Sequence, residues 1–378
     1  MLATTESIIT ASHWLERADR VAADVALHAA RHDGDDSFVE EGFAALKREG
    51  FFTALVPAEL GGGGASTTTI CECIRILARN CGSTALAFSM HCHLVAVAAW
   101  RHRHQGAPTD GLLKRVAAEG LVLVSTGGND WLSSGGEAVK VAGGFRISAR
   151  KPFASGSAMG DLLNTSALYD DPEAGPTVLH FAVPLAAPGV RIEPTWQVMG
   201  MRGTGSNDVV LDGVFVPEAG VAGRRPAGEW HMLFHVISKM AFAFIYSAYL
   251  GVAEAARDLA IEAAGKRAPN PLASQLAGEM ENALMVARLA NAEAIAIAED
   301  AEPGPQTTSA AMQCRQLTGQ HALTTVEKAL ELAGGSAFYR KSTLERLFRD
   351  IQAARFHPLQ EKPQLDLTGR VALGWPIG

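Results

Sequence analysis

The sequence lacks a strong excess of charge of either sign. Its 33 Lys and Arg residues are outnumbered by 40 Asp and Glu residues, the formal net charge is -7, and no long basic run occurs. Proteins that bind nucleic acid present clustered basic side chains to the phosphate backbone. We therefore expect no nucleic acid partner.

Cysteine is also scarce, with 5 residues scattered over a chain of 378. A few scattered cysteines, odd in number, are typical of reduced thiols and not of a disulfide framework. The first residues carry an early acidic side chain and no continuous apolar stretch, so they do not have the pattern of a secretory signal. These absences predict a cytoplasmic protein.

No uninterrupted apolar run of membrane-spanning length is evident. The most apolar stretch, Val236 to Ala253, is interrupted by Lys239 and by the polar residues Ser238 and Ser247. A spanning helix needs about 20 predominantly apolar residues. We expect this stretch to form a buried helix, and we expect no membrane anchor.

Apolar residues, in contrast, make up 48% of the chain. A chain of this length and composition can bury a large core and divide into two or three domains. Its 38 glycines and 17 prolines are too few to mark low-complexity disorder. The sequence therefore predicts a globular protein.

The pattern of the sequence changes twice along the chain. Residues 1–120 and 229–378 show helical periodicity, broken by short Gly or Pro punctuation. Residues 121–228 hold short β-branched or alternating runs separated by glycine and proline turns. No helix of ordinary length fits between these runs, so we expect a largely antiparallel sheet, as a small barrel or sandwich. This order predicts an α+β protein with a β domain between two helical domains.

Three clusters that look like motifs fail on their spacing or order. The glycines Gly61 to Gly64 are not followed by the Lys and Ser or Thr of a phosphate-binding loop. Six Cys and His residues between Cys71 and His93 include pairs two apart, which point in different directions on a helix. The segment GTGSND has the wrong order for a nucleophilic serine turn. We expect no metal site and no serine hydrolase.

Four segments carry the most specific signal in the chain. They are VSTGG, ARKPFASG, MGMRGTGSNDVVLDGVFVP and LAGGSAFYRKSTLERLFRD. Their order and spacing resemble those of the acyl-CoA dehydrogenase superfamily of flavoproteins, and the likeness extends from about Phe51 to about Pro358. The resemblance implies an N-terminal helical domain, a middle antiparallel β-barrel domain and a C-terminal four-helix bundle, which agrees with the order of helices and strands deduced above.

The resemblance also implies where a flavin binds. In this family the isoalloxazine ring lies between the β domain and the C-terminal bundle, and Thr126 and Ser155 match the positions that hold its edge. Phe153 matches an aromatic residue, usually tryptophan, that covers the ring. The ring edge needs hydrogen-bond partners on a rigid frame, and the ring face needs flat apolar cover. Each of these residues also fits an ordinary role at a strand end.

The residues for the adenosine and pyrophosphate end of FAD depart from the family pattern. Arg267 and Gln275 resemble an arginine and glutamine of one subunit, and Gly334 and Gly335 resemble a turn of a neighbouring subunit. The Phe-Gly that follows the arginine is missing, and Glu331 stands where the family has glutamine. A carboxylate repels a pyrophosphate. FAD is the predicted cofactor, with FMN as the alternative.

The candidate base departs most. Dehydrogenation beside a thioester needs a carboxylate opposite the flavin. Where most members have Tyr-Glu-Gly, this chain has a His-Pro-Leu sequence that begins at His357, and the alternative position aligns with Ala241. Glu361 is the remaining candidate base, although it equally fits a solvated carboxylate beside Lys362.

This departure is similar to the flavin monooxygenases that share the fold, which include dibenzothiophene and hydroxyphenylacetate enzymes and amino-sugar N-oxygenases. Ser155 and His357 match a serine and a histidine of several of them. The resemblance implies that Ser155 donates a hydrogen bond to the activated flavin and that His357 is a base tuned near neutral pH. His357 also fits a cation at a helix C-terminus.

Three functions therefore stay open. The first is a two-component monooxygenase that acts on a small organic substrate and receives reduced flavin from a reductase. The second is an acyl-CoA dehydrogenase that passes electrons to an electron-transfer flavoprotein, and the third is a scaffold without catalysis. We expect a homotetramer. We also expect Arg346, Arg349 and Asp350 to form an ion-pair network, while the role of Arg202 stays open.

Overall fold

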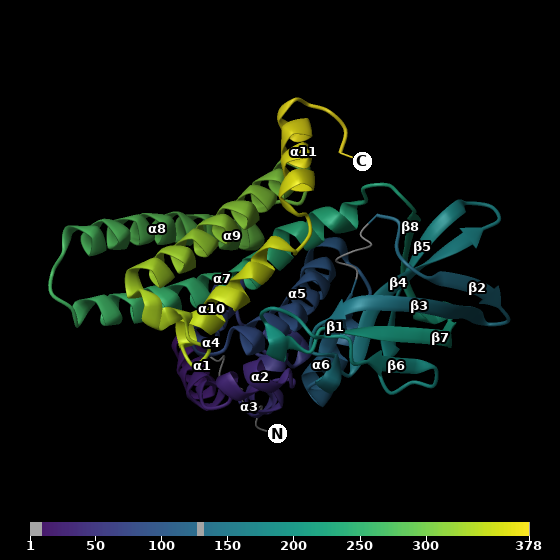
Figure 1. The fold of residues 1–378 in the computed structure, drawn as a ribbon. Helices are drawn as coiled ribbons and strands as arrows, with labels where there is room; N and C mark the ends of the chain where they lie inside the picture. The colour runs from purple at the N-terminus through teal and green to yellow at the C-terminus, as the bar shows by residue number, and fades with distance from the viewer. Residues whose placement is uncertain (1–9, 127–131, 378) are drawn as a thin grey trace, which may run out of the picture.

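The computed structural model describes residues 10–126 and 132–377, so Gly127 and Gly128 of the VSTGG segment lie outside the described residues. Helices, strands and again helices follow one another along the chain (Figure 1). The first helical region comprises α1 (Ala11–Ala26), α2 (Ala29–Asp35), α3 (Glu40–Arg48), α4 (Thr67–Asn80), α5 (Gly82–Gln105) and α6 (Asp110–Glu119). The predicted α+β order is confirmed.

The strands and the remaining helices complete the fold. The strands are β1 (Leu123–Ser125), β2 (Glu137–Val141), β3 (Gly144–Ala154), β4 (Leu162–Asp171), β5 (Gly175–Pro184), β6 (Val190–Glu193), β7 (Asn207–Pro217) and β8 (Val221–Pro226). The C-terminal helices are α7 (Met232–Gly265), α8 (Pro271–Asp300), α9 (Pro305–Ala333), α10 (Thr343–Ile351) and α11 (Glu361–Ala372). The predicted domain limits at residues 120 and 228 fall in the connections before β1 and after β8. The division into three domains at these residues stays a prediction.

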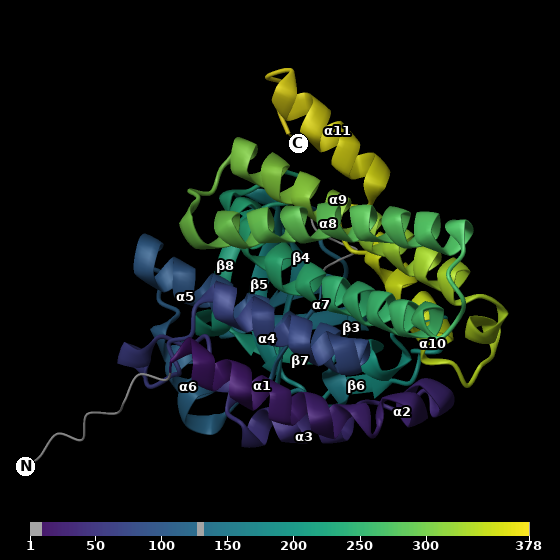
Figure 2. The same cartoon turned by 90° about the vertical axis from the view of Figure 1, so that its left-hand side faces the viewer.

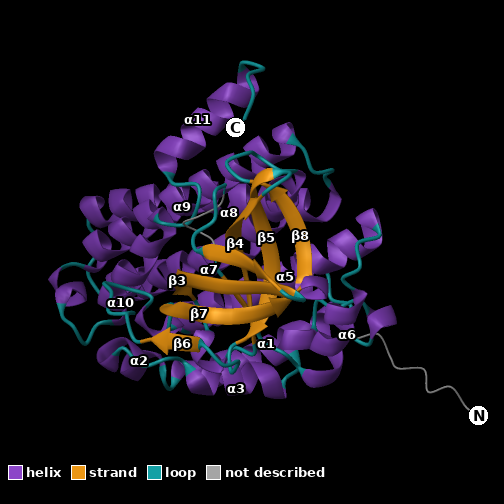
Figure 3. Ribbon diagram, turned by 90° about the vertical axis from the view of Figure 1, so that its right-hand side faces the viewer, coloured by secondary structure: helices purple, strands orange, loops and turns teal. Residues whose placement is uncertain are grey.

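The strands form one hydrogen-bonded sheet in the order β6-β7-β3-β2-β4-β5-β8, with β1 beside β4. The pairing is antiparallel except where β4 meets β1 and β2. The predicted antiparallel character is confirmed, and hydrogen bonds among the described strands leave the sheet open between β6 and β8. Figure 3 shows the strands beside the helices of both helical regions.

Helix α7 is the centre of the helical part of the protein. Figure 2 shows α8, α7, α4 and α1 as successive layers, with α11 standing away from them. The stretch from Val236 to Ala253 lies inside α7 and is buried almost throughout, so the predicted buried helix is confirmed. Its interruption at Lys239 is satisfied because the ammonium group donates to the carbonyl of Ala301 at the end of α8. Helices α5 and α7 are long and apolar enough to cross a membrane, but about nine-tenths of the most apolar part of each is buried in the fold.

Close approach of α7 and α4 depends on a glycine. A β-carbon at Gly251 would lie 2.4 Å from the carbonyl oxygen of Arg75, so no larger residue fits without moving a backbone. Beside this contact the buried carboxylate of Glu254 pairs with Arg75 of α4 at 3.1 Å and with Arg288 of α8 at 2.8 Å. The glycine contact and the ion pairs together fix the spacing of three helices.

We expect Gly251→Ala to lower the free energy of unfolding by about 1–3 kcal/mol, because overpacking forces the two helices apart. Gly278→Ala is the matched control: it lies on the exposed face of α8, and an added β-carbon meets no atom within 4 Å. Alanine there should stabilise the protein by up to about 1 kcal/mol through its higher helix propensity. Thermal unfolding followed by circular dichroism measures both. Equal stability of Gly251→Ala and wild type would contradict the close contact.

Candidate active site

Two strand ends place the predicted ring-edge residues. Thr126 follows β1, where its backbone N–H donates to the carbonyl of Asn164 at 3.3 Å and its hydroxyl donates to Thr165 at 2.6 Å. Both partners belong to β4, which runs parallel to β1. The side-chain nitrogen of Asn164 is buried and has no hydrogen-bond partner among the described residues. The strand end therefore keeps one free donor for a ligand.

His91 holds this strand end in place. Its Nε2 donates to the carbonyl of Phe52 at 2.8 Å, and its Nδ1 accepts the N–H of Leu123 at 3.0 Å. The two partners fix the neutral tautomer, and burial lowers the pKa of His91 to about 4. A histidine set aside at the sequence level as a poor metal ligand thus ties the start of β1 to α5. The HCH pattern of residues 91–93 was the available signal.

Phe153 lies where β3 shifts register against β7, between Lys151 and Ala154. Its φ of 60° falls in the left-handed region, which is uncommon for an aromatic residue. A bulge of this kind re-aims a side chain, and the ring of Phe153 is 54% exposed. It packs edge-on against Trp196, with ring centroids 6.0 Å apart. An exposed aromatic ring held by its backbone fits the predicted role of covering a flat ligand.

Ser155 is joined to a row of hydroxyl groups. Its Oγ lies 2.7 Å from that of Ser206, which lies 2.8 Å from Oγ1 of Thr204. Thr204 donates in turn to the carbonyl of Met201 at 2.9 Å. Ser206 and Thr204 are buried, whereas Ser155 is half-buried at the end of the row. The serine is therefore oriented by residues behind it.

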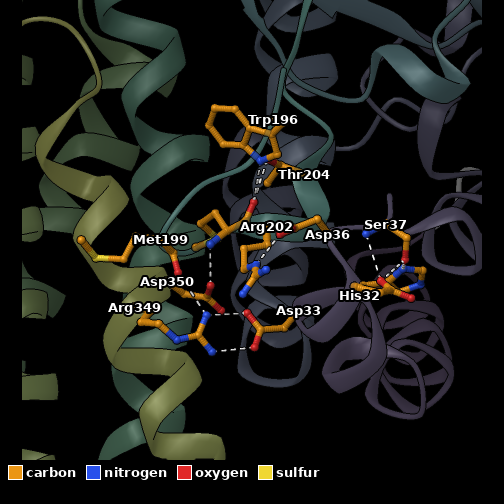
Figure 4. Close-up of polar contacts among 12 residues, drawn as sticks. His32, Asp33, Asp36, Ser37, Trp196, Met199, Arg202, Thr204, Arg349 and Asp350 are labelled. Atoms are coloured by element: carbon orange, nitrogen blue, oxygen red, sulfur yellow. Dashed lines mark hydrogen bonds and ion pairs between the residues drawn. The ribbon is translucent and has the colours of Figure 1, made fainter. Parts of the chain in front are cut away.

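The chain between β6 and β7, residues 194–206, is called the junction loop below because all three parts of the protein meet there (Figure 4). The N–H of Met201 donates to Asp350 of α10 at 2.5 Å. Arg349 of α10 binds both carboxylate oxygens of Asp33 in α2, at 2.6 and 2.7 Å, and donates to the carbonyl of Met199 at 3.1 Å. Arg202 of the loop pairs with Asp36 just after α2. The loop thus connects the sheet to both helical regions.

The predicted network of Arg346, Arg349 and Asp350 is only partly right. Arg349 pairs with Glu345 at 2.7 Å as well as with Asp33. Asp350 instead accepts a backbone hydrogen bond, and burial raises its pKa to about 6. The difference arises because α10 turns Asp350 toward the loop, a contact that helix spacing does not reveal.

His357 lies in a cluster of aromatic and hydrogen-bonding groups from α7 and α9. Its Nε2 is 2.6 Å from the hydroxyl of Tyr249, and its ring meets those of Tyr249 and Tyr246 at centroid distances of 5.5 and 6.2 Å. Its carbonyl accepts from Arg315 at 2.7 Å. Burial, followed by the nearby charges of Arg315 and His93, lowers the pKa of His357 to about 3.

The low pKa corrects both sequence-based interpretations of His357. A base tuned near neutral pH and a cation at a helix terminus each require an ordinary or raised pKa, whereas this imidazole is neutral at pH 7. Burial raises the pKa of the Tyr249 hydroxyl well above its usual value, so the phenol keeps its proton. Among the described residues its hydrogen-bond partner is Nε2 of His357, which leaves the imidazole proton on Nδ1. His357 is therefore a neutral donor.

The remaining candidate base, Glu361, begins α11 and is exposed. Its carboxylate lies 3.3 Å from the ammonium group of Lys362. Ala241, which aligns with the alternative base position, is buried in α7. Neither position brings a carboxylate into the His357 cluster. Among the described residues no group of His, Cys, Asp and Glu side chains is arranged to hold a metal.

Two of the residues assigned to the adenosine end, Arg267 and Gly334, lie close together within one chain. Arg267 follows α7 and donates to the carbonyl of Leu332 at the end of α9. Its guanidinium lies 3.6 Å from the β-carbon position of Gly334, whose φ of 78° favours glycine. The resemblance placed the arginine and the Gly-Gly turn on different subunits, whereas α7 and α9 end side by side here. Gln275 is exposed on α8, and Gly335 faces open space.

Comparisons with known proteins agree with this fold. The family model for the acyl-CoA dehydrogenase N-terminal domain matches residues 13–124, and that for the C-terminal domain matches residues 243–361. The putative acyl-CoA dehydrogenase YdbM of Bacillus subtilis is 30% identical, covering 91% of this chain and 92% of the relative. The amino sugar nitrososynthase RubN8 of Streptomyces rubradiris is also 30% identical, covering 98% and 92%.

A solved structure of KijD3 in complex with FMN and dTDP-3-amino-2,3,6-trideoxy-4-keto-3-methyl-D-glucose superposes with a TM-score of 0.88. It is 26% identical and covers 97% of this chain and 94% of its own. The protein belongs to the acyl-CoA dehydrogenase superfamily. It is a flavin-dependent oxidoreductase, as predicted from the sequence.

The contacts of Asp350 predict a pH-dependent stability. The pKa of Asp350 is about 6 in the native state, against an ordinary value of 3.8 that applies in the unfolded chain. As the pH rises, the unfolded chain therefore loses the Asp350 proton before the native state does. The charge thus destabilises the native state progressively from about pH 4 to pH 7. Asp350→Asn keeps an acceptor for Met201 but does not titrate. As the pH rises from 4 to 7, the free energy of unfolding of this variant should therefore increase relative to that of wild type by about 1–3 kcal/mol.

Chemical denaturation at a series of pH values measures this difference. Asp366→Asn, at an exposed position of α11, is the control and should show no such trend. A difference between Asp350→Asn and wild type that stays constant from pH 4 to pH 7 would mean that Asp350 titrates normally.

Proposed function

We propose that this enzyme is a flavin monooxygenase of the two-component type. It binds reduced flavin supplied by a separate reductase and transfers one oxygen atom of O2 to a small organic substrate. The observation that carries the proposal is the His357 imidazole: it is neutral, and the hydrogen-bond partners of His357 among the described residues are Tyr249 and Arg315 and not a carboxylate base. Bound reduced flavin would supply the electrons for oxygen activation.

The residues present fit such a flavin. Phe153 offers an exposed aromatic face, and Ser155 and Thr126 offer hydroxyl groups at two strand ends. The buried side-chain nitrogen of Asn164 has no hydrogen-bond partner within the described part of the chain. These residues would hold the ring, while His357 would donate a hydrogen bond near it. Either FMN or FAD satisfies these contacts, and solved relatives contain FMN or FADH2.

An amine is the substrate class that we propose. Relatives named as amino sugar nitrososynthases, and isobutylamine N-hydroxylase of Streptomyces viridifaciens at 30% identity over 318 residues, carry names that refer to amine substrates. A histidine without a carboxylate partner suits such chemistry, because a buried carboxylate would pair with a protonated amine and hold it in the unreactive form. The neutral imidazole of His357 and the cation of Arg315 do not favour a protonated amine, so the nitrogen lone pair stays free for oxygen transfer.

We also propose that the enzyme is a cytoplasmic homotetramer. The five cysteines are free and buried, which suits a reducing compartment. A groove of about 350 Å3 lies between α8 and α9. Large apolar side chains are exposed on α8, on α9 and on the segments after them: Leu272, Met285, Leu289, Leu317, Phe338, Tyr339, Phe356, Leu373 and Trp375. Such exposure is expected of a surface that other copies of the chain cover.

Oxygen labelling tests the proposed activity. Protein supplied with enzymatically reduced FMN or FAD, 18O2 and isobutylamine should form an N-oxygenated product that carries one 18O atom. Heat-denatured protein with the same reduced flavin is the control for free peroxide chemistry. Label from water in the product, or product without the enzyme, would contradict the proposal.

The dehydrogenase is the second candidate, favoured by the name of the YdbM relative. It predicts that protein purified with bound FAD loses its yellow colour anaerobically when butyryl-CoA is added. Recovery of the colour with an artificial electron acceptor would then replace the monooxygenase proposal.

His357→Ala should lower product formation about 10²- to 10³-fold, because one preorganised donor is lost, and it should leave reduced-flavin binding unchanged. Since its pKa is about 3, activity that depends on His357 should be flat from pH 5 to pH 8. Tyr249→Phe should also lower product formation, because without the Tyr249 hydroxyl the His357 proton is no longer held on Nδ1. His104→Ala, exposed at the end of α5, is the control. Unchanged turnover of His357→Ala would exclude the role.

A further inference from the structure

The hydroxyl groups behind Ser155 form what we call the hydroxyl relay: Ser155, Ser206 and Thr204, ending on the carbonyl of Met201. Each hydroxyl has one hydrogen to donate, so the direction of the row can be derived from its end. A carbonyl oxygen only accepts. The direction decides what Ser155 presents to a ligand.

The relay is anchored at Met201. Oγ1 of Thr204 lies 2.9 Å from the carbonyl oxygen of Met201. Two oxygens at this distance repel each other unless a hydrogen lies between them, and Thr204 is fully buried, out of reach of water. The single hydrogen of Thr204 therefore points to the carbonyl. The carbonyl is itself fixed, because Asp350 accepts the N–H of Met201 and Trp196 donates to the Met201 oxygen at 3.1 Å.

The rest of the direction follows step by step. Since Thr204 has spent its hydrogen, the 2.8 Å contact with Ser206 needs the hydrogen of Ser206. The 2.7 Å contact between Ser206 and Ser155 then needs the hydrogen of Ser155. The backbone N–H of Ser155 is also engaged, with the carbonyl of Phe153 at 3.0 Å. Ser155 therefore offers a ligand only lone pairs.

Thr126 has the same polarity. Its hydroxyl donates to Thr165 and its backbone N–H donates to Asn164. Both residues predicted to hold the ring edge thus spend their hydrogens inside the protein. This corrects the sequence-based expectation that Ser155 donates a hydrogen bond to the flavin.

One atom of the flavin edge changes its hydrogen-bonding character with redox state. N5 carries a lone pair in the oxidised ring and an N–H group in the reduced ring. An acceptor-only serine pairs with the N–H and faces the lone pair of the oxidised form without a hydrogen between them. We propose that the hydroxyl relay makes Thr204 and Ser206 specificity-determining residues, which select reduced over oxidised flavin through the polarity of Ser155. The proposal rests on the flavin site proposed above.

Matched variants of Thr204 test the relay. Thr204→Val keeps the shape but removes the hydroxyl, so the hydrogens of Ser206 and Ser155 are released toward the ligand. The ratio of the dissociation constants of oxidised and reduced FMN should then fall about five- to tenfold, the value of one hydrogen bond. A tenfold fall equals a shift of about 30 mV in the midpoint potential of the bound flavin. Thr204→Ser keeps the hydroxyl and should keep the wild-type ratio.

Ser206→Ala breaks the relay at its middle and should lower the ratio similarly. Ser157→Ala is the control, because Ser157 is buried nearby but donates to the carbonyl of Gly205 outside the relay. The constants are measured by fluorescence titration with oxidised FMN and anaerobically with dithionite-reduced FMN, after circular dichroism shows that each variant is folded.

The outcomes separate the two proposals. A lower ratio in Thr204→Val and Ser206→Ala, but not in Thr204→Ser and Ser157→Ala, supports the relay. Flavin binding with an unchanged ratio in both hydroxyl-deleted variants overturns the relay and leaves the proposed monooxygenase intact. Wild-type protein that binds neither form of FMN or FAD at micromolar concentration overturns both.

Discussion

The contact between the buried carboxylate of Asp350 and the N–H of Met201 is the constraint on which the position of the junction loop depends. It holds the junction loop so close to α10 that a β-carbon at Gly200 would lie 2.1 Å from the carbonyl oxygen of Arg349. Arg349 also binds the carboxylate of Asp33 and the carbonyl of Met199, so the same helix holds the loop and α2 together. A charged carboxylate buried in this way costs stability unless it is hydrogen-bonded. The role of the contact is therefore to position the junction loop.

The junction loop passes that position on to the strand ends. Trp196 supports the exposed ring of Phe153, and Thr204 and Ser206 orient Ser155. Phe153 near the end of β3 and Ser155 just after it are therefore both supported from one loop, and the loop is supported from α10. A ligand that binds at these strand ends senses the packing between the sheet and both helical regions, although no helix needs to touch it there.

The order of helices and strands and the buried α7 could be predicted, because periodicity is local, whereas the flavin-holding roles of Thr126, Phe153 and Ser155 stay predictions. Contacts that depend on distant partners could not be predicted. Arg349 and Asp33 are 316 residues apart, and His357 and Tyr249 are 108 apart. The pKa of His357 was misjudged for this reason: its neighbours in space, two tyrosines of α7 and the buried Arg315 of α9, are far from it in the sequence.

The residues that match the family motif indicate where we propose that a flavin binds, but not what it does. Ser155 matches a position common to the superfamily, and its polarity is decided by Thr204 and the carbonyl of Met201. His357 likewise takes its tautomer from Tyr249. One residue presents lone pairs and the other presents N–H, and in each case a neutral partner behind it fixes the choice. In a site without mobile charge, hydrogen-bond direction is what remains to distinguish one chemistry from another.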